Sequence, residues 1–586
     1  GVMSFELQKV KTASIPSTEA FHAMRGMRGI AVSCFCIWTL TDILLVDCAR
    51  NHQPPLEFER SGEDSFLLQH RQVSSHRVGR RHGDENPGVG IEGASPKSKF
   101  FLWMTDVHAD PYYGTEIQQC YESVSTTKGS PFGLIGCDPP YDLMQSAAAA
   151  AAEHAGHKAE FVLWTGDFSR HSMETMPDPS SNVSSIIGDV SRMVKAKFLH
   201  APTVFGALGN DDNPENYYVN ITTDQPTNPW FVKVGEELRD ADVMRRSILQ
   251  QYEYGSYFET QVGGLTILSL STVMYSVSHV PASNKSADPF GQFAWLRQQL
   301  TKAARRQHKV WIVGHIPPGI ETYGFSELWE PEYLSKYLEI VQDSVLGSAV
   351  AAQLFGHVHK DEFRVLPSAP PGAGPVFLSS SLSPVYYNNP SFKLVEYCSS
   401  TGRMLSYKVF FATLAASNAA PQWRFGYDLV QTYKRLERRT GLSMKSIARV
   451  SESLLSGLHN YVHYADWYAS NYSNSLQKWA VLGDPGYNQT YKLSRRRQYV
   501  CAMTIENQDA YDACLESASP VHDLRGVIRM LPRVAWGDEL TLCVTHLLAR
   551  ASFSDSPEAL KVKQVCDAKN WDALRVLALS SRCRIS

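Results

Sequence analysis

Short apolar runs alternate with helix-compatible segments along the middle of the 586-residue chain. Five largely apolar runs have the length of strands: residues 99–105, 160–165, 203–208, 310–313 and 351–355. Residues 142–154 between them have strong helix propensity, and residues 290–307 have the spacing of an amphipathic helix. Runs of this kind indicate buried strands, and their alternation with helices through short connections predicts an α/β domain.

The pattern also divides the chain into segments. The α/β domain is expected at residues 99–415, preceded at 50–98 by a polar, Gly- and Pro-containing linker. After it, residues 416–518 are aromatic-rich and helix-periodic and are expected to form a helical subdomain. Residues 519–586 are a tail without a recognisable motif, and its role stays open.

The first segment, residues 1–49, contains a mostly apolar run at 29–46 that follows Arg25 and Arg28 and is interrupted by Asp42. This polarity predicts either a cleaved signal peptide or a signal anchor with a single membrane span at 29–46. Both alternatives remain open at this stage. Either one predicts a protein of the secretory pathway lumen, soluble or anchored, and an acidic vacuole- or lysosome-like compartment is expected.

Cysteines and glycosylation motifs agree with that location. The chain has 11 cysteines, and Cys120 with Cys137, and Cys501 with Cys514, are close enough in sequence to close short loops in an oxidising lumen. Five Asn-x-Ser/Thr motifs permit glycosylation; they begin at Asn182, Asn220, Asn284, Asn471 and Asn488. The net charge of -3 gives no global basic field, so no nucleic-acid specificity is expected.

A short polar motif follows each of the five apolar runs. The motifs are Asp106-Val107-His108, Gly166-Asp167, Gly209-Asn210-Asp211-Asp212, Gly314-His315 and Gly356-His357-Val358-His359. Ligands in α/β sheets gather at the carboxyl ends of strands, so motifs spread over some 250 residues are expected to converge. Carboxylate, imidazole and amide groups together are the ligands that borderline divalent metals prefer. The pattern predicts the centre of a two-metal phosphoesterase.

Each motif alone has an ordinary structural explanation, since a buried His is usually a core residue and Gly-Asp is usually a turn. The joint pattern outweighs that explanation. Asp167 is expected to bridge the two metals, because a carboxylate has two oxygens to share. The first metal is expected to take Asp106, His108 and His359, and the second Asn210, His315 and His357. Strand alternation is expected to point the paired ligands to one side, and the glycines before four ligands let the backbone approach closely. The donor set accepts Zn, Fe, Mn or Co.

Three stretches carry a family resemblance: residues 105–113 (TDVHADPYY), 164–171 (WTGDFSRH) and 388–392 (NNPSF). They resemble the calcineurin-like metallophosphoesterases, specifically the acid sphingomyelinase-like branch that includes endopolyphosphatases. The resemblance covers about residues 98 to 515. It implies a four-layer αββα sandwich, two divalent metals and the ligand assignment given above.

One position departs from the wider family, which carries Gly-Asn-His where this chain has Asp211. Endopolyphosphatases similarly lack that His and carry Gly-Asn-Asn-Asp. An alcohol leaving group needs a general acid, whereas cleavage of a phosphoanhydride expels phosphate, a better leaving group. Asp211 therefore either acts as an acid in an acidic lumen or repels a polyanion. Arg170 and His171 are candidates to hold a distal phosphate, with surface solvation as the alternative.

The leading functional hypothesis is an endopolyphosphatase, which cleaves internal anhydride bonds of inorganic polyphosphate by two-metal hydroxide attack. The alternative is an acid sphingomyelinase-like phosphodiesterase that acts on nucleotides or phospholipid head groups. Residues 50–98 contain no Cys and so do not resemble the cysteine-rich lipid-presenting domain of full acid sphingomyelinases, which disfavours sphingomyelin. A third hypothesis is an inactive metal-bearing protein that binds phosphate polymers or a partner. The sequence leaves the oligomeric state open.

Overall fold

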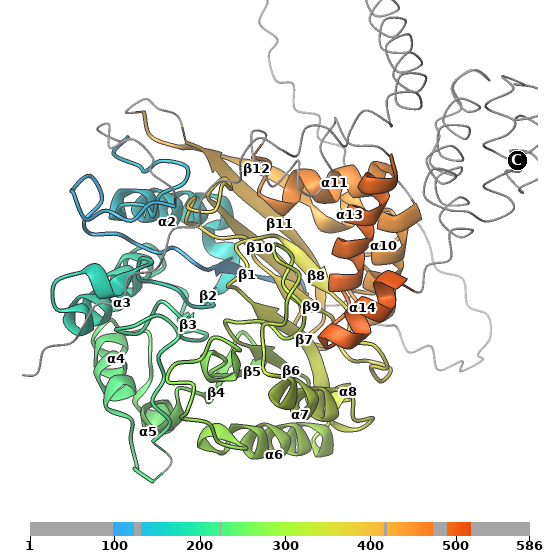
Figure 1. The fold of residues 1–586 in the computed structure, drawn as a ribbon, viewed down its shortest axis with the longest axis horizontal. Helices are drawn as coiled ribbons and strands as arrows, with labels where there is room; N and C mark the ends of the chain where they lie inside the picture. Colours follow the sequence, from blue (N-terminus) through green and yellow to red (C-terminus); the bar gives the residue numbers. More distant parts are fainter. Residues whose placement is uncertain are drawn as a thin grey trace, which may run out of the picture. The chain divides into compact units, whose positions relative to one another are not determined.

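Two six-stranded sheets form the centre of the computed structural model (Figure 1). The structure describes residues 98–121, 130–222, 224–414, 419–456, 458–472 and 489–516. The chain divides into two units, Gly1–Ile91 and Glu92–Ser586, and all described residues belong to the second. The predicted span at 29–46 and the tail at 519–586 lie outside the described residues. Among the described helices, none has the length and apolarity to cross a bilayer.

The first sheet has the strand order β12-β11-β10-β1-β2-β3. Strands β1, β2 and β3 form its parallel half, with β3 at the edge, while β10, β11 and β12 continue the sheet in antiparallel fashion beyond β1. The bounds are β1 Ser98–Met104, β2 Ala159–Trp164, β3 Thr203–Phe205, β10 Ser391–Cys398, β11 Met404–Thr413 and β12 Gln422–Asp428. The carboxyl ends of β1, β2 and β3 therefore lie along one edge.

The second sheet has the order β4-β5-β6-β7-β9-β8, with β5, β6, β7 and β9 parallel. A hairpin through Gly263 and Gly264 joins β4 to β5. The bounds are β4 Phe258–Val262, β5 Leu265–Ser269, β6 Val310–Val313, β7 Val350–Phe355, β8 Glu362–Arg364 and β9 Val376–Leu378. This sheet places the ends of β6 and β7 at its own carboxyl edge.

Strand alternation explains why the apolar runs are continuous. In β1, Phe101 and Trp103 belong to the core between the sheets, whereas Leu102 and Met104 belong to the core under the helices. The inner core holds residues of both sheets, among them Trp311 of β6, so the sheets pack face to face. A strand buried on both faces has no polar side to present, which is why periodicity along it is absent.

Helices cover the outer faces of both sheets (Figure 1). Asp178 and Asn228 cap α3 and α4 by accepting bonds from backbone N–H groups of the first turn, and a Pro follows each cap. The bounds are α2 Tyr141–Ala155, α3 Pro179–Lys197, α4 Pro229–Asp240, α5 Arg246–Gly255, α6 Gln292–Arg305, α7 Pro331–Val341 and α8 Leu346–Ala349. Helices, sheet, sheet and helices form the four layers of the predicted αββα sandwich, which is confirmed.

The first sheet extends past residue 415, where the sequence predicted only helices. Strand β12 pairs with β11 and adds an edge strand. Trp423, Phe425 and Tyr427 alternate with other residues along it, a period of two that indicates a strand. Helices then follow: α9 Leu429–Thr432, α10 Met444–Ser456, α11 Leu458–Tyr468, α13 Gln489–Ala502 and α14 Gln508–Glu516. The proposed segment boundaries otherwise stay a prediction.

Two disulfides have the pairing that the sequence made possible. Cys120 bonds to Cys137, and Cys501 bonds to Cys514 between α13 and α14. Stable disulfides indicate an oxidising compartment, which agrees with the lumen of the secretory pathway.

Candidate metal centre and active site

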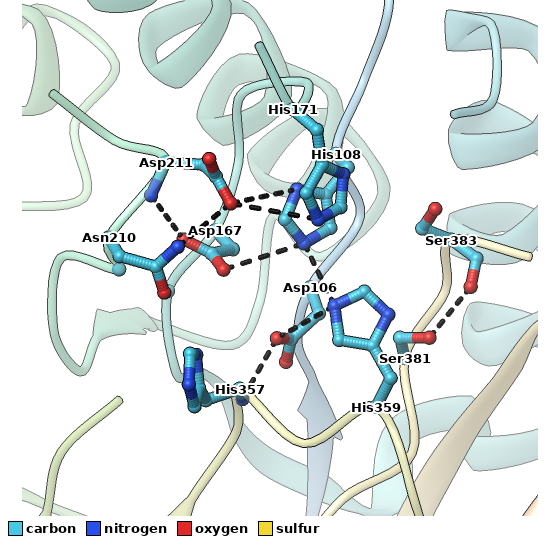
Figure 2. A network of polar contacts seen from close by, with 12 residues as sticks. Asp106, His108, Asp167, His171, Asn210, Asp211, His357, His359, Ser381 and Ser383 are labelled. Atoms are coloured by element: carbon cyan, nitrogen blue, oxygen red, sulfur yellow. Dashed lines mark hydrogen bonds and ion pairs between the residues drawn. The ribbon is translucent and has the colours of Figure 1, made fainter. Parts of the chain in front are cut away.

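The five polar motifs meet at the carboxyl edges of the two sheets, and Figure 2 labels residues of all but the Gly314-His315 motif. Each motif follows the strand that the sequence assigned to it, namely β1, β2, β3, β6 and β7. Two groups of side chains have ligand atoms within 4.8 Å of one another: Asp106, His108, Asp167 and His359, and Asp167, His315 and His357. The amide oxygen of Asn210 lies 3.2 Å from Nε2 of His315. The structure therefore brings all the predicted ligands together, in the predicted two groups.

Asp167 belongs to both groups. Its Oδ2 lies 3.4 Å from Nε2 of His108 on one side and 3.0 Å from Nε2 of His315 on the other. The backbone N–H of Asp211 donates to its Oδ1 over 2.9 Å. This position between the groups is the one that a bridging carboxylate needs, although the role of each residue as a ligand stays a prediction.

The histidines present the nitrogen that a metal would bind. Nδ1 of His108 lies 3.0 Å from the carbonyl oxygen of Ser169, and Nδ1 of His315 lies 2.7 Å from that of Thr165. A carbonyl only accepts, so Nδ1 carries the hydrogen and Nε2 of each ring faces the centre. Nε2 of His108 lies 3.0 Å from Nε2 of His359. Two ring nitrogens this close need a proton or a cation between them, which fits a metal.

The pKa values of the histidines in the centre also fit a metal site. Burial lowers the pKa of His108 and His359 well below the usual value, and burial together with His315 lowers the pKa of His357 to about 3. Neutral imidazole is the form that binds metals. Burial alone would lower the pKa of His315, but Asp167 and Asp106 raise it to about 10. A proton on His315 takes the place of a cation, so metal binding would displace it.

The paired ligands reach the centre through a left-handed backbone rather than through strand alternation. Positive φ angles occur at Asp106 (50°), His108 (45°), Asp167 (54°), His357 (70°) and His359 (61°). The prediction that period-two geometry aims these side chains is therefore wrong, because the residues lie just beyond their strands. Such conformations are uncommon for non-glycine residues and concentrate at functional sites.

Glycine is required before the ligands, as predicted, because there is no room for a side chain. A Cβ on Gly209 would overlap Oδ1 of Asp167, and one on Gly166 would lie 2.6 Å from Nδ1 of His315. Gly166 also has a φ of 97°, which other residues rarely adopt. The backbone thus approaches the ligand carboxylate and imidazole as closely as the chain allows.

Asp212 has no role that its sequence motif indicates, and the structure supplies one. Its carboxylate accepts backbone N–H groups of Asp167 (2.8 Å), Phe168 (2.7 Å), Ser169 (3.2 Å) and Gly209 (2.8 Å). Asp212 therefore joins the loop after β2 to the loop after β3. It holds the backbone of the bridging residue in place.

His171 lies over the centre beside Asp211 (Figure 2). Its ring stacks on that of His108 at 3.8 Å, and its Nε2 lies 3.7 Å from Oδ2 of Asp211. Asp138, which sequence reasoning missed, binds the opposite nitrogen Nδ1 at 3.0 Å and accepts the His171 backbone N–H. Burial would lower the pKa of His171, but Asp138 and Asp211 raise it to about 10. The contacts with Asp138 and Asp211 therefore favour the protonated form of His171.

The side chain of Asp211 is buried, and only one of its two carboxyl oxygens has a hydrogen-bond partner among the described residues. Its Oδ2 accepts from the amide of Asn210 over 2.9 Å, whereas its Oδ1 has no hydrogen-bond partner among the described residues. Burial raises the pKa of Asp211 well above the usual value. Its carboxyl group occupies the position at which the wider family resembled here carries a His.

Arg170 does not face the centre, so its expected role as a phosphate ligand needs correction. The guanidinium is buried and donates to Asp110, to the carbonyl of Ile117 and to the hydroxyl of Thr175. With these acceptors it ties the loop after β2 to the loop after β1. Consecutive residues point in different directions here, and only His171 reaches the centre.

A cavity of about 470 Å³ opens over the centre. Asp167, His171, Asn210, Asp211, His357 and His359 form its floor. Lys360 is the single Lys or Arg among the described residues that line it, and burial lowers the pKa of Lys360 to about 7. The other walls are largely tyrosine: Tyr121, Tyr217, Tyr323, Tyr386, Tyr387, Tyr468 and Tyr499. Two of these come from the C-terminal helices, Tyr468 from α11 and Tyr499 from α13.

Comparison with known proteins agrees with this geometry. Residues 101–361 match the family described as calcineurin-like phosphoesterase. Sphingomyelinase phosphodiesterase D of Dictyostelium discoideum is 27% identical over 58% of this chain and 76% of that protein. Cyclic GMP-AMP phosphodiesterase SMPDL3A of Mus musculus is 26% identical over 73% of this chain and 95% of that protein. Acid sphingomyelinase-like phosphodiesterase 3b of Homo sapiens is 27% identical over 74% and 94%.

These relatives support the broader part of the predicted resemblance, while closeness to endopolyphosphatases stays a prediction. The His/Asp cluster fits divalent metal ions whose identity is open. Over residues 101–361 the sandwich and its centre match the calcineurin-like phosphoesterase family, and the chain is similar to the acid sphingomyelinase-like phosphodiesterases.

Proposed function

We propose that this protein is a metal-dependent phosphodiesterase whose substrate carries an aromatic or otherwise apolar group beside the scissile phosphate. The observation that carries the proposal is the lining of the cavity, to which the described part of the chain contributes seven tyrosines and one lysine. A polyphosphate chain has charge on every unit, and its recognition calls for several cationic side chains. Tyrosine faces instead suit a flat ring or a quaternary ammonium group. The names of the related phosphodiesterases favour the same choice over polyphosphate.

The residues above the centre supply what cleavage of an ester needs. When bound, two divalent cations would provide Lewis-acid activation of water and of the phosphate oxygens. His171 holds a proton at Nε2, because Asp138 fixes Nδ1 and the neighbouring carboxylates raise its pKa. It can donate this proton to the oxygen of a leaving alcohol. With His171 as the acid, an alcohol leaving group would be protonated even though Asp211 stands where the resembled family carries a His.

Turnover of two diesters with the same thymidine 5′-phosphate tests the role of His171. One releases p-nitrophenolate, which leaves without a proton, and the other is a dinucleotide that releases a nucleoside alcohol. The wild-type protein with added Mn²⁺ or Zn²⁺ is expected to cleave both. His171→Gln is expected to lose roughly 10²- to 10⁴-fold on the dinucleotide and much less on the aryl ester. Equal losses on both would show that His171 acts by positioning rather than as an acid.

An Asp167→Asn variant serves as the inactive control, and retained turnover in it would contradict the site assignment. Endopolyphosphatase activity remains a second candidate, favoured by Asp211 at the position where the resembled family carries His. Long-chain polyphosphate is therefore incubated with the same preparation and its length followed on a gel. Early intermediate lengths without diester turnover would establish the second candidate. Bound metal without turnover of any substrate would support the inactive binder.

A further inference from the structure

Lys360 is a buried lysine in the wall of the cavity that forms no ion pair with a described residue, and Glu362 is the carboxylate that acts on its charge from a longer distance. It is only 2% exposed, yet it lines the cavity directly after His359. Its Nζ donates to the carbonyl oxygen of Tyr386 over 3.0 Å. Among the described residues, no carboxylate lies within 4.0 Å of this nitrogen. Burying an ammonium group without an opposite charge is costly, so its place in the wall calls for an explanation.

Lys393, which is also buried, has the contacts expected of a lysine with a structural role. Lys393 forms a 2.7 Å ion pair with Asp361 and donates to the carbonyl of Leu378 over 2.7 Å. It also lies 4.3 Å from the centre of the Tyr407 ring. Lys360 has only one neutral acceptor and a ring, that of Tyr468, at 6.0 Å. Its remaining N–H groups are available to a group that enters the cavity.

Lys360 is close to the metal centre through Tyr386. The ring of Tyr386 packs edge-on against His359 at 4.8 Å and against His171 at 5.2 Å. The carbonyl of the same residue accepts the Lys360 ammonium. A molecule whose phosphate lies at the centre can therefore extend along the tyrosine wall toward Lys360.

We propose that Lys360 binds a second anionic group of the substrate, in addition to the phosphate held at the metal centre. The inference rests on the proposed phosphodiesterase function and narrows its substrate class. A diester with a further phosphate or carboxylate satisfies Lys360, whereas a phosphocholine ester brings a second positive charge into the same cavity. Lys360 thus favours substrates with a second negative charge, while the metal centre holds the phosphate that is cleaved.

A matched pair of substrates tests this inference. The p-nitrophenyl ester of thymidine 5′-phosphate is compared with the same ester carrying a 3′-phosphate, which adds the second anion without changing the bond that is cleaved. We expect wild-type kcat/KM to favour the 3′-phosphorylated ester about tenfold or more, as one charged hydrogen bond implies. Lys360→Met should reduce this ratio to near one, and Lys360→Arg should keep it. Lys336 is half-buried and does not line the cavity, so it provides the control variant Lys336→Met, which should keep the wild-type ratio.

Binding of thymidine 3′,5′-bisphosphate and thymidine 5′-monophosphate, measured by calorimetry with metal present, gives the same comparison without turnover. Lys360→Met should remove the preference for the bisphosphate. An unchanged preference in Lys360→Met, or none in the wild type, would overturn the inference. If neither ester is hydrolysed but the bisphosphate preference depends on Lys360, the proposed reaction fails and the anion site stands.

Discussion

The carboxylate of Asp212 offers the sharpest test of how the centre is held. Its Oδ1 accepts the N–H groups of Phe168 (2.7 Å) and Ser169 (3.2 Å), and its Oδ2 accepts those of Asp167 (2.8 Å) and Gly209 (2.8 Å). The substitution Asp212→Asn keeps the shape but replaces one oxygen with an NH₂ group. Two backbone N–H groups would then face a donor instead of an acceptor.

The size of the effect follows from those two lost bonds. A hydrogen bond to a charged group contributes about 1.5–3 kcal/mol, and a buried donor without an acceptor adds to the loss. Relaxation of the loops offsets part of this, so we expect the free energy of unfolding to fall by about 3–5 kcal/mol. The backbone of Asp167 should shift with the loop, so bound metal should fall as well. Urea titration and metal analysis of the purified variant measure the two effects.

Asp343 provides a matched control, because its carboxylate accepts the N–H groups of Val345 (2.9 Å) and Leu346 (2.8 Å) near the surface. Water can replace the lost acceptor there, so Asp343→Asn should be clearly milder and should leave metal content unchanged. If Asp212→Asn is no more destabilising than Asp343→Asn and keeps its metal, the four-bond account of the centre is refuted.

Three further outcomes are expected. Gly209→Ala should lower turnover about 100-fold and reduce bound metal, because its Cβ would overlap Oδ1 of Asp167; wild-type metal content would contradict this. Chelation should lower the melting temperature, since a ligand at about 100 times its Kd stabilises by about 2.7 kcal/mol, and an identical melting curve would argue against a folded-state metal site. Replacing Cys120 and Cys137 together by Ser should cost about 3 kcal/mol for a loop with a sequence separation of 17, which an unchanged urea midpoint would disprove.

Much of the centre could be predicted because its geometry follows from the sheet. Parallel strands share a carboxyl edge, so the motifs after β1, β2 and β3 had to be neighbours in one sheet and those after β6 and β7 in the other. The face-to-face packing of the two sheets then brings the two edges together. The need for glycine before a ligand, as at Gly209, could also be predicted, because the backbone has to approach the ligand side chains closely. The left-handed backbone at Asp106 or His359 was not, because it depends on contacts between loops rather than on local sequence.

Other features needed the folded chain. Asp138 lies 33 residues before His171, and nothing in the intervening sequence marks the pair. Arg170 looked like a phosphate ligand because of its neighbours, but Asp110, 60 residues away, determines where it points. The tyrosine wall was also hidden, since its members come from several loops and helices. The tyrosine lining of the cavity, more than the predicted metal ligands, is the reason for preferring a phosphodiester to polyphosphate as the substrate.

The floor of the cavity and part of its walls are formed by different segments of the chain. Every predicted metal ligand precedes Lys360, whereas Tyr468 and Tyr499 come from α11 and α13. The backbone N–H of Asp361 donates to the carbonyl of Tyr468 over 3.1 Å, which joins the two parts. Substitutions confined to α11 and α13 can therefore alter which substrates bind while leaving the residues of the metal centre unchanged. For an engineer, this separation makes the two helices the place to build a library of altered specificities on one unchanged catalyst.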